Sequence, residues 1–133
     1  MKILFVNNFR YRGGGEEFLM ELLPGLARKG VTIGIVCRPN TPLATMFKGM
    51  PIEIYPVEKS GLSGISSFFK IARIIRLKGY DILCIQRGHD ILQSWFASLL
   101  SNRRSKLIYI VHVADFINSR FLLGCMHRVV TIS

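Results

Sequence analysis

Short segments that are apolar throughout alternate along this chain with longer segments whose apolar residues recur every three or four positions. The apolar segments cover residues 4–6, 33–36, 82–85 and 107–111. A strand that is apolar on both sides has to be covered on both sides, which is typical of a parallel sheet between helices. The alternation therefore predicts an α/β fold: a doubly wound, parallel, Rossmann-like sheet of about six strands in the order 3-2-1-4-5-6, with helices on both faces.

The same pattern predicts the individual elements. We expect strands over 2–6, 31–37, 52–57, 81–86, 106–112 and 128–132, and helices over 16–29, 43–48, 65–78, 91–101 and 116–126. Acids at the start of the first helix and bases at its end match the helix dipole, whereas Pro24 should kink or loosen that helix. Asp90 is a candidate N-cap, and Pro56 marks its strand as an edge strand.

The composition is that of one folded domain. Of the 133 residues, 50% are hydrophobic and 20% are charged, which excludes an intrinsically disordered protein. The length suffices for one core, and no linker interrupts it, so we expect a single Rossmann-like domain over residues 1–133. The net charge is +10, and residues 61–133 carry 10 basic and 3 acidic side chains. Such an excess attracts nucleic acid, anionic membranes or phosphorylated small molecules, and does not choose among them.

Targeting and redox signals point to the cytoplasm. No apolar run approaches the roughly 18 residues of a membrane-spanning helix, and the run at the start is too short for a signal peptide. Cys37, Cys84 and Cys125 are far apart and show no CxxC spacing, which predicts reduced thiols rather than a disulfide framework. The three histidines form no zinc-binding pattern, so we expect no metal site.

Three consecutive glycines, Gly13 to Gly15, stand between the first predicted strand and the first predicted helix. In a dinucleotide-binding fold such a turn lets a pyrophosphate approach the helix N-terminus. The match is poor here, since Phe18 stands where G-x-G-x-x-G needs its third glycine, and Glu16 and Glu17 would face the phosphate. Two alternatives remain: the glycines allow tight packing into a well-capped helix, or they leave room for a ligand that comes close.

Two polar clusters, 86–90 and 112–115, follow the fourth and fifth predicted strands. Because parallel strands place their carboxyl ends at one edge, where open α/β sheets bind ligands, both clusters should meet the glycine turn there. Arg87 and His89 are therefore candidate substrate-binding residues. A histidine in this place can bind a sugar hydroxyl, act as an acid or base, or simply cap the strand.

In order and spacing these features resemble the family 4 glycosyltransferases, which have the GT-B architecture of two facing Rossmann-like domains. The resemblance covers essentially the whole chain and identifies it as the N-terminal domain of such an enzyme. It rests on Gly-Gly-Gly-Glu at 13–16, Ala-Arg-Lys-Gly at 27–30, the strand 81–86, His112-x-x-Asp115 in place of the family's H-G-x-D, and the strand that ends in Ser133. Val113 departs from that pattern, because it replaces the usual glycine.

The resemblance implies a retaining, metal-independent transfer from a nucleotide-sugar donor to a glycan or lipid-linked glycan, with no further cofactor. It implies that Gly14 and Gly15 approach the donor diphosphate, that His112 contacts the donor sugar, and that Asp115 lies near the reacting centre. His112 and Asp115 are thus the expected catalytic residues. The C-terminal domain that grips the nucleotide lies outside residues 1–133, in the same or a second chain, so we expect this chain alone to be inactive.

The helix predicted over 65–78 gives a clue to a further partner. Its expected apolar face consists of Ile65, Phe68, Phe69, Ile71, Ala72 and Ile75, and its bases are Lys70, Arg73, Arg76 and Lys78. Ile74 and Leu77 fall among the bases. The helix either packs on the sheet with a solvated basic side, or presents Lys70, Arg73, Ile74 and Leu77 to an anionic membrane.

A function of another class stays open as the alternative. It is a non-catalytic Rossmann-like module that binds RNA or phosphorylated ligands through charge. Such a module would not need the set Gly14, Gly15, His112 and Asp115.

Overall fold

The computed structural model describes residues 1–8, 13–58, 63–111, 124 and 126–131. The strands are β1 (Lys2–Val6), β2 (Thr32–Cys37), β3 (Ile52–Pro56), β4 (Ile82–Ile85), β5 (Lys106–Val111) and β6 (Arg128–Thr131). The helices are α1 (Gly14–Arg28), α2 (Pro42–Met46), α3 (Ser63–Lys78) and α4 (Gly88–Leu100). The helix predicted over 116–126 falls largely outside the described residues.

The six strands form one sheet in the order β3-β2-β1-β4-β5-β6, and every neighbouring pair is parallel. Both the predicted fold and the predicted strand order are confirmed. β1 lies in the middle and pairs with β2 on one side and β4 on the other. The sequence therefore changes direction across the sheet at β1, and the carboxyl ends of β1 and β4 meet at this switch point, where ligands bind in open α/β sheets.

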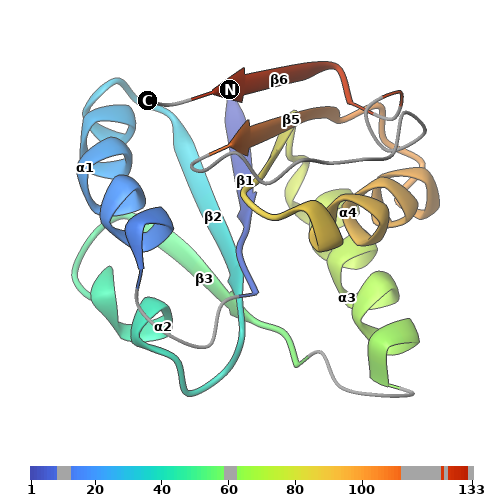
Figure 1. Cartoon of the computed structure of the whole chain (residues 1–133), viewed down its shortest axis with the longest axis horizontal. Coiled ribbons are helices and arrows are strands. Elements are labelled where there is room, and N and C mark those ends of the chain that lie inside the picture. The colour runs from blue at the N-terminus through green and yellow to red at the C-terminus, as the bar shows by residue number, and fades with distance from the viewer. Residues whose placement is uncertain (9–12, 59–62, 112–123, 125, 132–133) are drawn as a thin grey trace.

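Helices cover both faces of the sheet, with α1 and α2 on one side and α3 and α4 on the other (Figure 1). Each central strand divides its side chains between the two cores, since successive residues of a strand point to opposite sides. In β1, Phe5 packs with the core under α1 and α2, and Leu4 with the core under α3 and α4. Burial on both sides explains why these strands are apolar throughout.

The packing of Tyr80 across β2 requires a glycine inside that strand. Gly34 of β2 lies under Tyr80, and a Cβ at this position would overlap the Tyr80 hydroxyl. Tyr80 is buried and its hydroxyl lies 3.0 Å from that of Tyr55 in β3. The glycine thus lets a large aromatic side chain cross β2 and reach the edge strand. That β3 is an edge strand, as Pro56 predicted, is confirmed by the strand order.

Two local predictions need correction or comment. The N-cap of α4 is Arg87, not Asp90, because the helix begins at Gly88 and takes Asp90 into its first turn, where the side chain is buried. α1 runs as one helix through Pro24. A proline costs a helix one N–H hydrogen bond, and the buried Leu19 and Leu23 hold this helix on the sheet over the same turn.

Candidate functional site

Polar side chains are buried where β1 and β4 end. Asn7 and Asn8 follow β1 directly and are 0% and 5% exposed, and the buried Gln86 follows β4. The Asn7 N–H donates to the Val36 carbonyl at 2.9 Å, so the chain continues the sheet for one more residue. Because consecutive extended residues point to opposite sides, Asn7 reaches residues of α1 and Asn8 reaches residues of α4.

The first network joins β1, α1 and β4. Asn7 Nδ2 donates to Glu16 Oε1 at 3.1 Å and to Gln86 Oε1 at 2.8 Å. Glu16 Oε2 accepts from the Gly13 N–H at 2.9 Å, and Gln86 Nε2 donates to the Gly15 carbonyl at 3.3 Å. Glu16 is only 1% exposed. The glycine turn is therefore tied on both sides to the sheet edge beneath it.

The second network joins β1 to α4 and α3. Asn8 Nδ2 donates to Asp90 Oδ1 at 3.0 Å and to Gln93 Oε1 at 3.3 Å, and Gln93 Nε2 donates to Ser67 Oγ. Asp90 is completely buried. Arg38, which follows β2, donates from Nε to the Asn8 carbonyl at 3.1 Å. This places a half-buried guanidinium group at the same edge of the sheet.

The structure places Gly14 and Gly15 at the first two positions of α1, with Gly13 as the N-cap, rather than in a free turn. A Cβ at Gly14 would meet nothing within 4 Å, and one at Gly15 would make only an ordinary contact, 3.9 Å from Gln86 Oε1. Neither glycine has a positive φ. Within the described ranges, then, packing does not require a glycine at position 14, whereas the well-capped start of α1 is confirmed, since Glu16 accepts from the N–H of the N-cap Gly13.

Arg87 and His89 lie where β4 passes into α4, at the same edge. Arg87 is partly buried, and the side chain of His89 is 52% exposed. His89 Nε2 lies 3.4 Å from Asp90 Oδ1, and Asp90 is in turn held by Asn8. The buried carboxylate can thus orient an exposed imidazole toward a ligand. His112 and Asp115 lie outside the described residues, so their roles stay predictions.

Two of the three cysteines are buried free thiols in the structure. Burial raises the pKa of Cys37 to about 11, and it raises the pKa of Cys84 to about 12. Both thiols are therefore protonated and unreactive at neutral pH. Cys125 lies outside the described residues.

Sequence reasoning pointed to the carboxyl edge of the sheet, where these polar side chains lie, but missed the side chains that organise this edge. Asn7, Asn8, Glu16 and Gln93 were not among the predicted site residues. Two asparagines directly after an apolar strand were an available signal of a polar network at this edge. Asparagine side chains that are buried need hydrogen-bond partners. Glu16 was interpreted as a helix-dipole residue and as an acid that would face a bound phosphate, and a buried partner for it was not expected, because its position in the first turn already explains an acid.

The comparisons with known proteins agree with this fold. The chain is similar to MurG of Acinetobacter baumannii (TM-score 0.76, 15% identity), covering 98% of this chain and 40% of that one. It is similar to the lipopolysaccharide outer core galactosyltransferase WaaB (TM-score 0.74, 14% identity), covering 97% and 38%. It is also similar to Anabaena Alr3699/HepE in complex with UDP-glucose (TM-score 0.66, 19% identity), covering 85% and 29%.

The chain thus spans well under half the length of each of these structures. None of the curated proteins matches its sequence. The model of Glycosyltransferase Family 4 matches residues 12–133, nearly the whole chain. Together with the parallel six-stranded sheet, this match shows that the chain is an N-terminal domain that belongs to Glycosyltransferase Family 4.

Proposed function

We propose that this chain is the acceptor-side half of a two-domain enzyme that transfers a sugar from a nucleotide-sugar donor to a glycan or lipid-linked glycan. The family match and the GT-B neighbours support this proposal, and HepE is a neighbour solved with UDP-glucose bound. In the proposed enzyme the Gly14 and Gly15 N–H groups meet the donor diphosphate. Arg87 and His89 bind substrate, and His112 and Asp115 act at the reacting centre, with no metal ion or further cofactor.

The observation that carries the proposal is the unexplained cost of Gly14 and Gly15. A glycine costs about 1 kcal/mol relative to alanine in the interior of a helix, and at the first two positions of α1 it still adds no side chain and leaves the unfolded chain more freedom to lose. Nothing in the described part of the chain occupies the space that a Gly14 side chain would take. Neither N–H has a hydrogen-bond acceptor among the described residues. A diphosphate that lies against the turn accounts for both the missing side chain and the two available donors.

Gly14→Ala tests the proposal, because it separates stability from activity. The protein needed is one that contains residues 1–133 together with a nucleotide-binding half, encoded downstream or supplied as a second chain. Gly14→Ala should keep or raise stability and should raise the KM for the nucleotide sugar by about tenfold or more. Gly25→Ala is the matched control, since it lies in the same helix and its Cβ also meets nothing within 4 Å.

Release of nucleoside diphosphate from UDP-, GDP- and ADP-hexoses provides the readout. An enzyme that turns over none of them would overturn the proposed function. Turnover by residues 1–133 alone would overturn the need for a second half. The binding-module alternative predicts a different result, namely RNA binding whose affinity falls steeply with salt and does not respond to Gly14→Ala.

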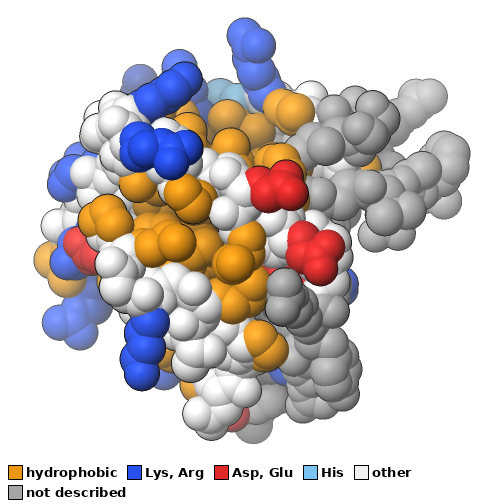
Figure 2. Space-filling model, turned by 90° about the vertical axis from the view of Figure 1, so that its left-hand side faces the viewer, with side chains coloured by type: hydrophobic (Ala, Val, Ile, Leu, Met, Phe, Trp, Pro, Cys, Tyr) orange, Lys and Arg blue, Asp and Glu red, His pale blue; other side chains and the backbone are white. Residues whose placement is uncertain are grey.

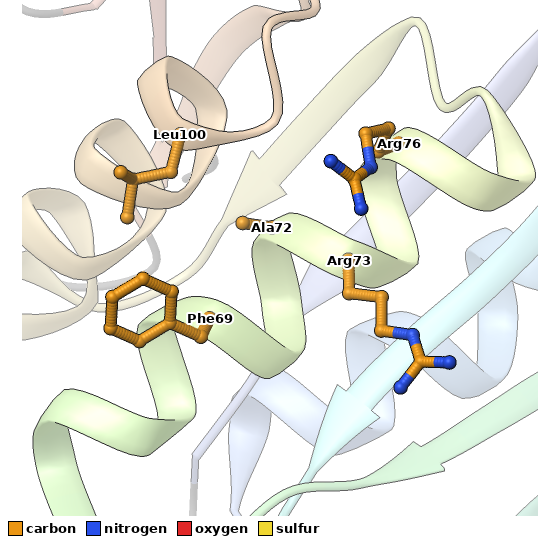
Figure 3. Close-up of a pocket in the computed structure, with 5 residues that line it drawn as sticks. All are labelled: Phe69, Ala72, Arg73, Arg76 and Leu100. Atoms are coloured by element: carbon orange, nitrogen blue, oxygen red, sulfur yellow. The ribbon is translucent and has the colours of Figure 1, made fainter.

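The outer surface of α3 and α4 supports a membrane-bound acceptor. These helices carry seven of the twelve exposed large hydrophobic side chains of the described residues: Ile65, Phe69, Leu77, Leu92, Phe96, Leu99 and Leu100. Between them lies a groove of about 360 Å³. Figure 3 shows Phe69 and Leu100 approaching each other from the two helices, and Arg73 and Arg76 farther along α3.

Charge favours an anionic partner for this groove. α3 carries four basic residues and no acid, and the one acid of α4, Asp90, is buried. The proposal therefore extends to docking on an anionic membrane, with exposed apolar side chains in the headgroup region and bases on lipid phosphates. Ile74 has to be removed from the set expected at the membrane, because it is partly buried against the core, whereas Phe69 is 59% exposed.

The face that carries α1 is the rival surface. Figure 2 shows a collection of hydrophobic side chains there, with basic side chains around it and acidic ones beside it. α1 exposes Glu17 and Glu21, which an anionic membrane would repel, and its one large exposed hydrophobic side chain is Met20. Among the described residues, no helix is long and apolar enough to span a membrane.

Vesicle sedimentation tests this extension. Phe69→Ser with Leu100→Ser should lower binding to vesicles rich in phosphatidylglycerol by about tenfold or more, because the two side chains lose their insertion energy. Met20→Ser on α1 is the control and should change binding little. Arg73→Gln with Arg76→Gln should remove the preference over neutral phosphatidylcholine, whereas Arg28→Gln should not. Failure of the parent protein to bind either vesicle would overturn membrane docking and leave the transferase proposal intact.

A further inference from the structure

Three buried side chains close a hydrogen-bonded ring beneath the glycine turn. We call the set Asn7, Glu16 and Gln86 the Glu16 ring; it also includes the Gly13 N–H and the Gly15 carbonyl. The ring brings together the end of β1, the first turn of α1 and the end of β4. Asn7 and Gln86 are 79 positions apart in sequence, so only the folded sheet edge assembles it.

The chemistry of the ring requires a carboxylate at position 16. Two donors converge on this side chain, the Gly13 N–H on Oε2 and Asn7 Nδ2 on Oε1. A carboxylate has acceptors on both oxygens, whereas a carboxamide has one acceptor and would turn its NH₂ toward one of the donors. At 1% exposure no water shell would compensate for the lost bond. Glutamate thus fits where glutamine, of equal size, does not.

The ring decides which backbone groups of the turn remain available. It uses the Gly13 N–H and fixes the Gly15 carbonyl, while the Glu16 and Glu17 N–H groups donate to the Gly13 carbonyl at 3.1 and 3.2 Å. The donors left over are the Gly14 and Gly15 N–H groups, which have no acceptor among the described residues. Gly14 is exposed and Gly15 is partly exposed.

We propose that Glu16, held by Asn7 and Gln86, is a positioning residue that orients the Gly14 and Gly15 N–H groups toward the diphosphate of a nucleotide sugar. This inference rests on the proposed function. Glu16 does not touch the ligand; it acts through the turn that it fixes. Its negative charge also occupies the favourable end of the α1 dipole, so the turn offers a diphosphate only neutral donors. The nucleotide must then be gripped mainly by the other half of the enzyme.

Glu16→Gln breaks the ring at one atom. Glu17→Gln is the matched control, since it makes the same change in charge at an exposed position in the same turn. In the chain of 133 residues, Glu16→Gln should shift the amide NMR signals of Gly13, Gly14 and Gly15 and speed hydrogen exchange at Gly13 by about tenfold or more. Glu17→Gln should leave exchange at Gly13 within about twofold of the parent.

A second variant restores the Gly13 side of the ring with its polarity exchanged. In Asn7→Asp/Glu16→Gln the new carboxamide can donate to the new carboxylate and still accept from the Gly13 N–H, and the ring keeps a single negative charge. The bond to Gln86 Oε1 is lost, because an aspartate at position 7 has no donor for it. Exchange at Gly13 should therefore return part of the way toward the parent value. Unchanged glycine signals in Glu16→Gln, or no recovery in the double variant, would overturn the ring as the device that sets the turn.

Kinetics of the two-domain enzyme then show whether Glu16 positions the donor-binding N–H groups or only stabilises the turn. Glu16→Gln should raise the KM for the nucleotide sugar by about tenfold, change kcat less, and be rescued in part by the double variant. An unchanged KM together with fast exchange at Gly13 would show a structural role only and overturn the proposal. A parent enzyme without any turnover would overturn the proposed function and the ligand assigned to the turn, while the exchange data would still decide the ring.

Discussion

Two regions of the molecule depart from the usual distribution of side chains. The carboxyl edge of the sheet buries polar side chains, whereas the outer surface of α3 and α4 exposes apolar ones. At the edge, Asn7, Glu16 and Asp90 are polar or charged and at most 1% exposed. On the helices, Phe69 and Leu77 are apolar and 59% and 66% exposed. Buried polar groups and exposed apolar groups are the informative exceptions in a folded protein. We propose that each arrangement marks a surface at which this domain meets a binding partner.

The two regions differ in what holds them. The edge is specific, because its buried side chains Asn7, Asn8 and Glu16 each bind particular partners at hydrogen-bonding distances, and the loss of one partner leaves another group unsatisfied. The helix surface is tolerant, because an exposed apolar side chain has few contacts to lose. Substitutions should therefore be costly at the edge and nearly free for stability on the helices, although both should affect function.

Among substitutions at the carboxyl edge and on the helix surface, the largest effect is expected at Asn8. Asn8→Ala removes the Nδ2 donor from both the buried Asp90 carboxylate and Gln93. Loss of a donor to a buried charge should lower the free energy of unfolding by about 3 kcal/mol. Urea denaturation followed by circular dichroism measures it. A loss below about 1 kcal/mol would mean that the edge is as tolerant as the helix surface and would remove the contrast.

The next effect concerns coupling between the two networks. Asn7→Ala and Gln86→Ala share a hydrogen bond, so their destabilisations should be non-additive by about 1 kcal/mol. Asn7→Ala and Gln93→Ala act in different networks, on opposite sides of the sheet, and should add within about 0.5 kcal/mol. Double-mutant cycles of unfolding free energy decide this. Equal coupling in both pairs would show one continuous polar core instead of two networks.

A smaller effect is expected on the helix surface. Leu99 is 58% exposed, so Leu99→Ser should change the free energy of unfolding by less than about 0.5 kcal/mol. Leu23→Ala in the core, where the side chain is fully buried, should cost about 2–5 kcal/mol. Urea denaturation of both variants compares the unfolding free energy lost at the helix surface with that lost in the core. A large loss at Leu99 would show that this surface is packed in solution and is not a free face.

The smallest effect comes from an ordinary surface ion pair, which serves as a baseline for both regions. The Lys78 ammonium, 2.8 Å from Glu53, and the Tyr55 hydroxyl hold the pKa of Glu53 below its usual value of 4.5. A lowered folded pKa adds stability above the unfolded pKa and loses it as the pH falls through the folded pKa.

Because the Glu53 side chain is 45% exposed, Glu53→Gln should cost only a few tenths of a kcal/mol at pH 7. This difference from the parent should shrink as the pH falls below 4.5. Thermal denaturation at several pH values checks it, and a difference that grows toward low pH would contradict the assigned sign.

The order of the strands, the edge position of β3 and the two-layer helix cover followed from local patterns. Apolar periodicity is a property of a few consecutive residues, and the rules for crossover connections convert it into a sheet order. The carboxyl edge could also be predicted, since it depends only on the strands being parallel. The N-cap of α4 could not be predicted from the sequence. Arg87 is the N-cap because the helix begins soon after β4 ends, and Asp90 instead points inward and accepts a hydrogen bond from Asn8.

The sequence by itself determined which residues form strands and helices, because alternation and helical spacing act within single elements. Only the tertiary structure decided that Glu16 is a ring member and not merely a dipole acid, since its partners Asn7 and Gln86 come from strands that lie side by side only in the sheet. It also decided which apolar residues of α3 are exposed. The contact that α3 makes is not centred on its predicted apolar face, so packing leaves Phe69 of that face exposed and partly buries Ile74, which was expected among the bases.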